Sequence, residues 1–251
     1  MSRPTAPRGR PRAAALAERG IDTRQNILDA FTHLVAQRGY QATSISSIAE
    51  AAGVTKGTVV HHFATKDHMM QEAQTQYFLR RVEEFSRILA EVDDPELQLT
   101  AAIYLTIRAH RDDRAGTVAF MREYAHYLFA EMTPELQTLR SEYAALMVGI
   151  VRKGEAKGVF AVKNARLTSL QIFGMVNHLW TWYRPEQSES AEEITAQFAH
   201  NILYGVVSAR SGTDRSVEDL AVFLHTLKPW LAPVQTYAPS RFTASEAERD
   251  T

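Results

Sequence analysis

Apolar residues recur at helical spacing along nearly the whole chain, and this periodicity constrains the fold more than any other feature. One stripe comprises Ile27, Ala30, Phe31, Leu34 and Val35. Its members stand at i, i+3, i+4, i+7 and i+8, so they share one face of a helix. A second stripe with the same 3.6-residue period runs from Leu136 to Val151. Because no stretch alternates as a β-strand requires, the sequence predicts an all-α fold.

Residues that favour helix starts divide the chain into separate helices. The expected N-caps are Asp22 or Thr23, Thr43 or Ser44, Thr55, Thr65, Asp94, Thr133, Asn164, Ser190 and Ser216. Prolines 95 and 134 follow two of these caps at the first helical position. Ser190 and Glu193 have the spacing of a capping box. The helix from Asn164 is expected to reach Tyr183, and the last short helix is expected to end at Leu227.

Charge is unevenly distributed between the ends of the chain. The 251 residues carry a net charge of −1, but residues 1–66 hold nine Lys/Arg and only four acidic residues. A basic end on an acidic body favours an anionic partner such as nucleic acid. The alternative is a chance fluctuation in charge. We expect a flexible basic arm at 1–20, where prolines and Gly9 interrupt any helix. A DNA-binding domain at 21–66, a larger helical domain at 67–230 and a disordered tail at 231–251 would follow.

Composition excludes several classes of protein. The chain has no cysteine, which excludes disulfide frameworks, thiolate metal sites and cysteine nucleophiles. Its longest apolar run, Tyr143–Val151, is shorter than the roughly 20 residues of a membrane helix, and the N-terminus has no signal-peptide core. We therefore expect a cytoplasmic protein with no membrane partner. We expect no enzyme and no metal, since His-Glu-x-x-His and Gly-x-Ser-x-Gly motifs are absent.

Two short helices joined by a tight glycine turn have the dimensions of a helix-turn-helix. They are expected at Ile45–Ala52 and Lys56–His62, with Gly53 in the turn. A helix of this kind enters the major groove, where side chains near its N-terminus, here Lys56 and Thr58, reach base edges. Gly57 would let the backbone approach the phosphates closely. The alternative from the residues alone is a helical hairpin inside an ordinary bundle.

The stretch Thr23–Ala73 resembles the DNA-binding domain of the TetR family of transcriptional regulators. The matching residues are Ile27-Leu28, Ala30, Gly39-Tyr40, Ala42 to Ile45, Ile48 to Val54, Thr55 to Thr58, His61-His62-Phe63 and Lys66. The resemblance implies double-stranded DNA as a partner and a three-helix DNA-binding domain followed by a helical-bundle domain for ligand binding and dimerisation.

The resemblance also implies which residues contact DNA. They are Thr43, Thr55, Lys56, Gly57, Thr58, His61, His62 and Lys66, of which Thr43 and Lys66 would contact the DNA backbone. One position departs from the family, which usually has a backbone-contacting tyrosine where this chain has Val60. That contact is expected to be lost or to move to a neighbouring histidine.

The N-terminal arm carries a second basic motif. Arg8, Arg10 and Arg12 stand in Arg8-Gly-Arg-Pro-Arg12, which resembles the core of an AT-hook. Such a peptide lays arginines into a narrow, A·T-rich minor groove. We favour the other interpretation, a solvated basic tail that attracts phosphates without selectivity.

The family's dimer interface would here comprise the helices at about 164–183 and 190–209. The residues expected to contact a second copy of the chain are Phe173, Gly174, Val176, Trp180, Phe198, Ile202 and Gly205. The two glycines would permit close helix approach and the others would supply apolar area. The alternative is that these residues serve the protomer core only.

The segment Phe173–Pro185 is similar to a TetR subgroup, several members of which respond to acyl-CoA thioesters or related acids. The expected ligand-binding residues are Arg108, Arg122, His126, Tyr127, Tyr143, His178 and Trp182, with His110 and Tyr124 nearby. Such a mixture suits an apolar small-molecule effector with an anionic end and no other cofactor. Alternatively the tyrosines are core residues and the arginines pair with Glu123, Glu131 or Glu142.

Together these features predict a homodimeric repressor that a ligand releases from a pseudo-palindromic operator. An activator, or a regulator of the same fold without a ligand, remains the alternative. A helical interaction protein without DNA binding is disfavoured by the basic N-terminal quarter and the Gly-Val-Thr-Lys-Gly turn.

Overall fold

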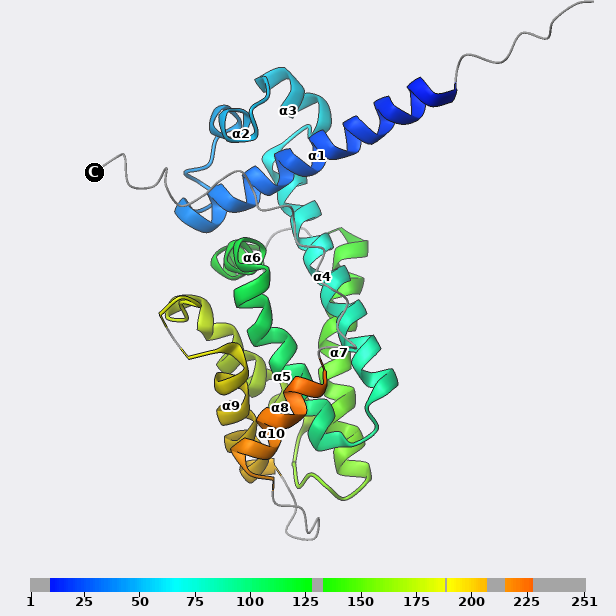
Figure 1. Ribbon diagram of the computed structural model, residues 1–251, viewed down its shortest axis with the longest axis vertical. Coiled ribbons are helices and arrows are strands. Elements are labelled where there is room, and N and C mark those ends of the chain that lie inside the picture. Colours follow the sequence, from blue (N-terminus) through cyan, green and yellow to red (C-terminus); the bar gives the residue numbers. More distant parts are fainter. Residues whose placement is uncertain (1–9, 128–132, 188, 207–214, 228–251) are drawn as a thin grey trace, which may run out of the picture. The chain divides into compact units, whose positions relative to one another are not determined.

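The structure is a computed structural model that describes residues 10–127, 133–187, 189–206 and 215–227. Its helices are α1 (Arg10–Arg38), α2 (Ile45–Ala52), α3 (Lys56–His62), α4 (Lys66–Glu91), α5 (Pro95–Asp112), α6 (Arg114–Tyr127), α7 (Pro134–Ala156), α8 (Ala165–Asn177), the 3-10 turn η1 (His178–Thr181), α9 (Ala191–Val206) and α10 (Val217–Thr226). Across the described ranges there is no β-strand (Figure 1), so the all-α prediction is confirmed.

The chain forms two compact units, Met1–Ala73 and Gln74–Thr251. The sequence placed the boundary seven residues earlier, at the start of α4. The first two turns of α4 belong to the first unit instead, and Met69 and Met70 on these turns are fully buried. Helix α4 therefore begins in one unit and continues into the other.

The prediction of a flexible arm at 1–20 is wrong for residues 10–20, because α1 begins at Arg10. The expected start at Asp22 or Thr23 lies in the middle of this helix. Pro11 does not interrupt it, since proline at the first turn lacks only an N–H that would have no helical partner there. Residues 1–9 and the predicted tail at 231–251 lie outside the described residues.

In the first unit, glycines and caps set the boundaries of the short helices. Gly39 ends α1 with a φ of 87° and Gly53 ends α2 with a φ of 65°, a region that side chains disfavour. Ser44 caps α2 in a capping box with Ser47. Thr55 caps α3 by accepting a hydrogen bond from the Thr58 amide.

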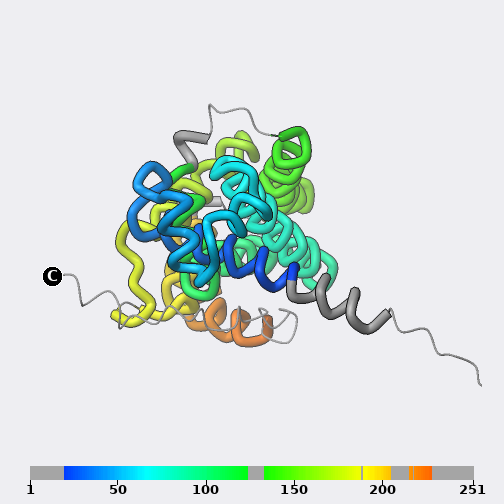
Figure 2. Tube along the Cα trace, turned by 90° about the horizontal axis from the view of Figure 1, so that it is seen from above, coloured from blue at the N-terminus to red at the C-terminus, as the bar shows by residue number. Residues whose placement is uncertain are grey.

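The second unit is built around α5, which is buried from Leu99 to His110. Helices α6 to α10 all pack against α5 or against its neighbours, and α7 and α9 lie on opposite sides of it (Figure 1). Helix α10, orange in Figure 2, packs on α9 and α5 at the edge of this unit. Its Leu220, Leu224 and Leu227 are buried in the core.

Most predicted caps of the second unit are confirmed, including Asp94, Thr133, Asn164 and Ser216. The capping box of Ser190 and Glu193 is also present. The helix expected over 164–183 is shorter, because α8 ends at Asn177 and the chain tightens into the 3-10 turn η1. Within the described residues, no helix combines the length and apolar character needed to cross a membrane.

Candidate nucleic-acid interface and effector site

The core of the first unit fixes the orientation of α3 about its own axis. Val59 and Phe63 are completely buried, and Ile48 of α2 is buried as well. The Asn26 amide donates a 2.8 Å hydrogen bond to the Ala52 carbonyl, which ties α1 to the end of α2. The Arg24 guanidinium lies 4.2 Å from the centre of the Phe63 ring and pairs with Glu72. Because Val59 and Phe63 face inward, the opposite side of α3 faces solvent.

The outward face of α3 consists of Lys56, Gly57, Val60 and His61, all of which are exposed. Their spacing of one, four and five residues places them together on one side of a helix. This surface offers one cation, one imidazole and one apolar side chain, with a glycine where the backbone itself is open. It matches the surface by which a recognition helix enters the major groove.

Three other predicted DNA-contacting residues lie beside this face or at the start of α3. His62 is half-buried, and burial lowers its pKa, with His61 and Arg24 lowering it further. The hydroxyls of Thr55 and Thr58 lie 2.9 Å apart, and Thr55 serves as the cap of α3. Thr55 therefore positions the helix, and His61 is better placed than His62 to reach DNA.

Thr43, which the resemblance implies to contact the DNA backbone, is used within the first unit. Its side chain is buried, and its hydroxyl donates a 2.9 Å hydrogen bond to the Gly39 carbonyl. The prediction of a DNA backbone contact through this side chain is therefore wrong in this structure. Ser44, the next residue, is the exposed cap of α2.

Lys66 is also used within the first unit. Its ammonium donates hydrogen bonds of 3.1 Å to the Tyr40 carbonyl and 2.7 Å to the Thr43 carbonyl. It lies 4.3 Å from the centre of the Tyr40 ring, whose hydroxyl donates to Asp67 at 2.6 Å. Two of its three N–H donors thus hold the turn before α2, so Lys66 is a positioning residue before it is a phosphate ligand.

The proposed hook is only partly described. Arg8 lies outside the described residues, and Arg10 and Arg12 lie on the first turn of α1. Residues 10–12 are helical rather than extended, and nothing in the described residues tests whether these arginines contact DNA. A minor-groove role for this motif therefore stays a prediction.

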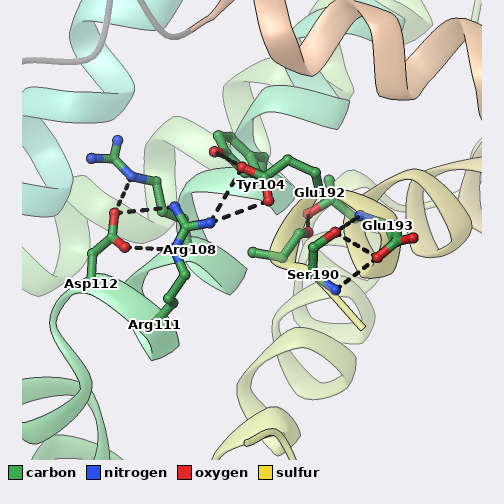
Figure 3. A network of polar contacts seen from close by, with 9 residues as sticks. Tyr104, Arg108, Arg111, Asp112, Ser190, Glu192 and Glu193 are labelled. Carbon is green, nitrogen blue, oxygen red and sulfur yellow. Dashed lines mark hydrogen bonds and ion pairs between the residues drawn. The ribbon is translucent and has the colours of Figure 1, made fainter. Parts of the chain in front are cut away.

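In the second unit, Arg108 belongs to a network between α5 and α9 (Figure 3). Arg108 and Arg111 each bond the Asp112 carboxylate at 2.6 Å. Arg111 reaches Glu192 at 3.2 Å, and the Tyr104 hydroxyl donates to Glu192 at 2.8 Å. Burial and the bond to Glu192 raise the pKa of Tyr104 to about 12.

Arg108 was expected to bind a ligand or to pair with a glutamate of the middle helices, and its partner is instead the nearby Asp112. Asp112 lies four residues along the same helix. The Nη1 atom of Arg108 is buried and makes no hydrogen bond within the described residues. One donor therefore remains for another group.

Tyr143 lies inside an aromatic cluster of the core. Its ring centre is 5.1 Å from that of Phe85, 5.2 Å from Phe173 and 5.8 Å from Phe78. Its hydroxyl is 3.3 Å from the Thr106 hydroxyl, and burial raises its pKa. Tyr143 is thus both a core residue and a polar group in an apolar interior.

Among the remaining ligand predictions, those with described side chains are exposed. His178 and Trp182 are exposed at the η1 turn and do not lie in this buried interior, so their binding of a ligand stays a prediction. Arg122 is exposed on α6. The backbones of Tyr124, His126 and Tyr127 lie on α6, but their side chains lie outside the described residues.

Arg81, the most deeply buried cation among the described residues, was not predicted as a site residue. Its side chain is 4% exposed, its guanidinium carbon lies 5.3 Å from the centre of the Tyr77 ring, and its Nε lies 2.9 Å from Glu84. Nε and Nη1 make no hydrogen bond of good geometry within the described residues. A signal was available, because Arg81 interrupts the apolar stripe of α4 four residues after Tyr77 and four before Phe85.

His110 adds a second buried polar group. It lies on α5, with Nδ1 3.0 Å from the Thr106 carbonyl. Burial, together with the charges of Arg114 and Arg81, lowers its pKa to about 4. The imidazole is therefore neutral at pH 7. Arg81, His110 and Tyr143 give this core a polar interior that could receive part of a ligand.

The predicted dimer residues divide into buried and accessible groups. Val176 is completely buried in the protomer core, so its assignment to an interface is wrong. Phe173, Phe198 and Ile202 are half-buried and pack against the same core. Trp180 is half-buried, Gly174 is exposed on α8 and Gly205 lies on α9.

The most exposed apolar side chains on these helices were not among the predictions. Leu167 and Leu170 on α8 are 57% and 50% exposed, and Tyr204 on α9 is 63% exposed. Leu167, Leu170 and Gly174 follow helical spacing on the solvent face of α8. The sequence could have shown this, because they alternate with buried Ile172 and Val176 on the opposite face.

Comparison with known families matches both units. Residues 27–73 match "Bacterial regulatory proteins, tetR family", and residues 92–206 match "Tetracyclin repressor-like, C-terminal domain". The chain therefore belongs to the TetR family of DNA-binding transcriptional regulators, and the resemblance seen in the sequence is confirmed.

Within that family the chain is similar to HTH-type transcriptional repressor KstR2 of Rhodococcus jostii, with 26% identity over 188 residues, 74% of this chain and 91% of the relative. The solved ketosteroid regulator KstR2 of Mycobacterium tuberculosis has 21% identity, a TM-score of 0.63 and coverage of 74% and 95%. AibR, solved with isovaleryl coenzyme A and operator DNA, has 20% identity, a TM-score of 0.64 and coverage of 74% and 98%. These two likenesses show the shared fold.

Proposed function

We propose that this chain is a repressor whose homodimer binds a pseudo-palindromic operator and leaves it when a small effector binds. The outward face of α3 is the observation that carries the proposal. Its Lys56 and His61 are exposed, while Val59 and Phe63 of the same segment are completely buried. The Rhodococcus jostii relative is a transcriptional repressor, which supports repression over activation.

A homodimer is supported by exposed apolar side chains on α8 and on α9. Leu167, Leu170 and Tyr204 are each at least half exposed. Apolar side chains exposed together at helical spacing are typical of a surface that a partner covers. A second copy would supply the two recognition helices that a pseudo-palindrome requires.

The effector is proposed to be an apolar molecule with an anionic end, such as an acyl-CoA. Arg81 has guanidinium donors without good hydrogen-bond geometry, and Tyr143 and Phe85 supply an aromatic surface in the same core. The structure of AibR with isovaleryl coenzyme A supports this ligand class. The polar atoms that would receive the anionic end are those of Arg81 and Arg108.

Helix α4 provides a route from effector to DNA. It carries Lys66, which holds the turn before α2, and fifteen positions later Arg81. An effector that binds preferentially to a conformation with α4 in a different position would lower the population of the DNA-binding conformation. Couplings of this kind are typically about 1–3 kcal/mol.

The test begins with site selection from a random duplex library. The proposal predicts an enriched motif with two inverted half-sites, bound at near-physiological salt about 10³-fold or more tightly than scrambled DNA. Acyl-CoA thioesters of increasing chain length are then added to the complex. Release by one of them supports the effector class. Equal, salt-sensitive binding to all sequences would contradict the proposal.

The oligomeric state of the purified protein is measured separately by light scattering. We expect Leu170→Glu to yield monomers that have lost operator binding, because a charge replaces exposed apolar area. The matched control is Val222→Glu on α10, where the original side chain is 65% exposed. A dimeric Leu170→Glu protein would contradict the proposed interface.

A further inference from the structure

We propose that Val60 is a specificity-determining residue that contacts the C5-methyl group of a thymine in each operator half-site. The inference rests on the proposed DNA binding through α3 and deepens it. It assigns one side chain on the outward face of α3 to one chemical feature of the major groove.

The position of Val60 follows from the packing of its neighbours. Val59, one residue earlier, is completely buried, while Val60 is 52% exposed. Rotating α3 to bury Val60 would expose Val59 and Phe63, which the core does not allow. Val60 therefore stays on the outward face, between Lys56 one turn before it and His61 beside it.

The surroundings of Val60 allow a close approach to a base. Gly57, three residues earlier on the same face, has no side chain, and a Cβ built there would meet only the Thr55 hydroxyl at 3.6 Å. The valine methyls are therefore not screened by a neighbour on that side. A β-branched side chain in a helix also occupies one preferred rotamer, so ordering its methyls on DNA costs little entropy.

The chemistry of Val60 restricts what it can recognise. Its side chain has no hydrogen-bonding group, so it can serve neither a phosphate nor a polar base edge. The major groove displays hydrogen-bond donors and acceptors from all four bases, and its apolar feature is the thymine methyl. Water is displaced from both surfaces when they meet, which favours the contact.

The size of the effect follows from the area of one methyl group. Removing one buried methyl from such a contact is expected to weaken binding about fourfold. A symmetric operator contains the contact twice, so losing both methyls is expected to weaken binding by about fifteenfold.

The experiment replaces thymine by deoxyuridine, which removes the methyl and keeps every hydrogen-bonding group. Duplexes recovered by site selection are prepared with each thymine replaced in turn, symmetrically in both half-sites. Anisotropy titrations compare the wild type, Val60→Ala and the matched control Val222→Ala, an exposed valine of α10. Thermal melting by circular dichroism checks that the variants fold equally well.

We expect the affinity of the wild type and of Val222→Ala to fall about fifteenfold when one symmetric pair of thymines is replaced by deoxyuridine. Val60→Ala should bind the unmodified duplex about as weakly as the wild type binds the uracil-substituted duplex. Replacing that thymine pair by uracil should not weaken the binding of Val60→Ala any further. Should Val60→Ala fail to fold, Val60→Thr retains the branched shape with one methyl fewer and is expected to show a reduced uracil effect.

Two results would overturn the assignment. One is a wild type that tolerates uracil at every thymine, and the other is a Val60→Ala protein that keeps the full uracil effect. Both leave sequence-specific binding intact, so they contradict this inference alone. Failure to recover any specific duplex would instead contradict the proposed function together with the inference.

Discussion

The two units of this chain differ in where they place the polar side chains that we assign to function. These side chains face solvent in the first unit and are buried in the second. In the first unit, the outward face of α3 presents Lys56 and His61, and apolar Val59 lies inside. In the second unit, Arg81 and His110 are buried in the interior. A unit that recognises DNA needs its polar groups in solvent, whereas a unit that encloses a ligand needs some of them in its core.

The contrast predicts the largest stability effect at Arg81. Replacing it by leucine leaves the Glu84 carboxylate without its buried partner, which should lower the free energy of unfolding by about 3 kcal/mol. Arg80→Leu is the matched control, because Arg80 is a third exposed and pairs with Asp113 at 2.7 Å. It should cost less than about 1 kcal/mol. Urea unfolding measures both, and equal losses would contradict a buried ionic interior.

A pH effect of similar size is expected from His110. Its pKa in the folded protein is lowered to about 4 from 6.5, so the unfolded chain binds more protons between these values. Stability is therefore full above about pH 6.5 and falls as the pH drops toward 4, by about 3 kcal/mol in total. His110→Gln lacks this titration. Urea unfolding at pH 7 and pH 4.5 should show the smaller decrease in the variant, and identical decreases would refute the assignment.

Substitutions of Lys66 and Lys56 should have different effects, because Lys66 stabilises the first unit and we expect Lys56 to contact DNA. Lys66→Met removes two hydrogen bonds from an ammonium to carbonyls and should destabilise the first unit by about 2 kcal/mol. Lys56→Met should leave stability unchanged and reduce the slope of log affinity against log salt by about one for each half-site. Thermal melts and salt titrations distinguish the two. A Lys66→Met protein of wild-type stability would show that Lys66 is no positioning residue.

The smallest effect concerns the start of α2. Ser44→Ala removes the capping box and should cost about 1 kcal/mol. Ser46→Ala, on an exposed position inside the same helix, should be neutral or slightly stabilising, because alanine favours helices. If urea unfolding shows the same stability for both variants, the cap contributes nothing measurable.

Local signals allowed much of this fold to be predicted. The Ser190–Glu193 capping box and the left-handed Gly53 are set by a few neighbouring residues, and both are present as expected. The start of α1 could not be read in this way, because Pro11 breaks a helix in its middle but is tolerated in its first turn. Whether Pro11 predicts a helix or a break therefore depends on where the helix begins.

The candidate sites were harder to predict because exposure depends on distant parts of the chain. Thr43 and Lys66 lie 23 residues apart, and their use within the turn depends on contacts between them and the end of α1. Arg81 was missed because a polar residue in an apolar stripe is usually placed at the helix surface. Val176 and Leu170 differ by six residues on one helix, and only the packing of that helix shows which is buried.

The central claim, that the outward face of α3 recognises DNA, is tested most directly by one binding measurement. The ratio of affinities for selected and scrambled duplexes is determined by anisotropy for the wild type and for a Lys56→Met, His61→Ala double variant. We predict a wild-type ratio of about 10³ or more. The variant should lose about tenfold or more of that ratio at an unchanged melting temperature. An unchanged ratio in the variant would contradict the account.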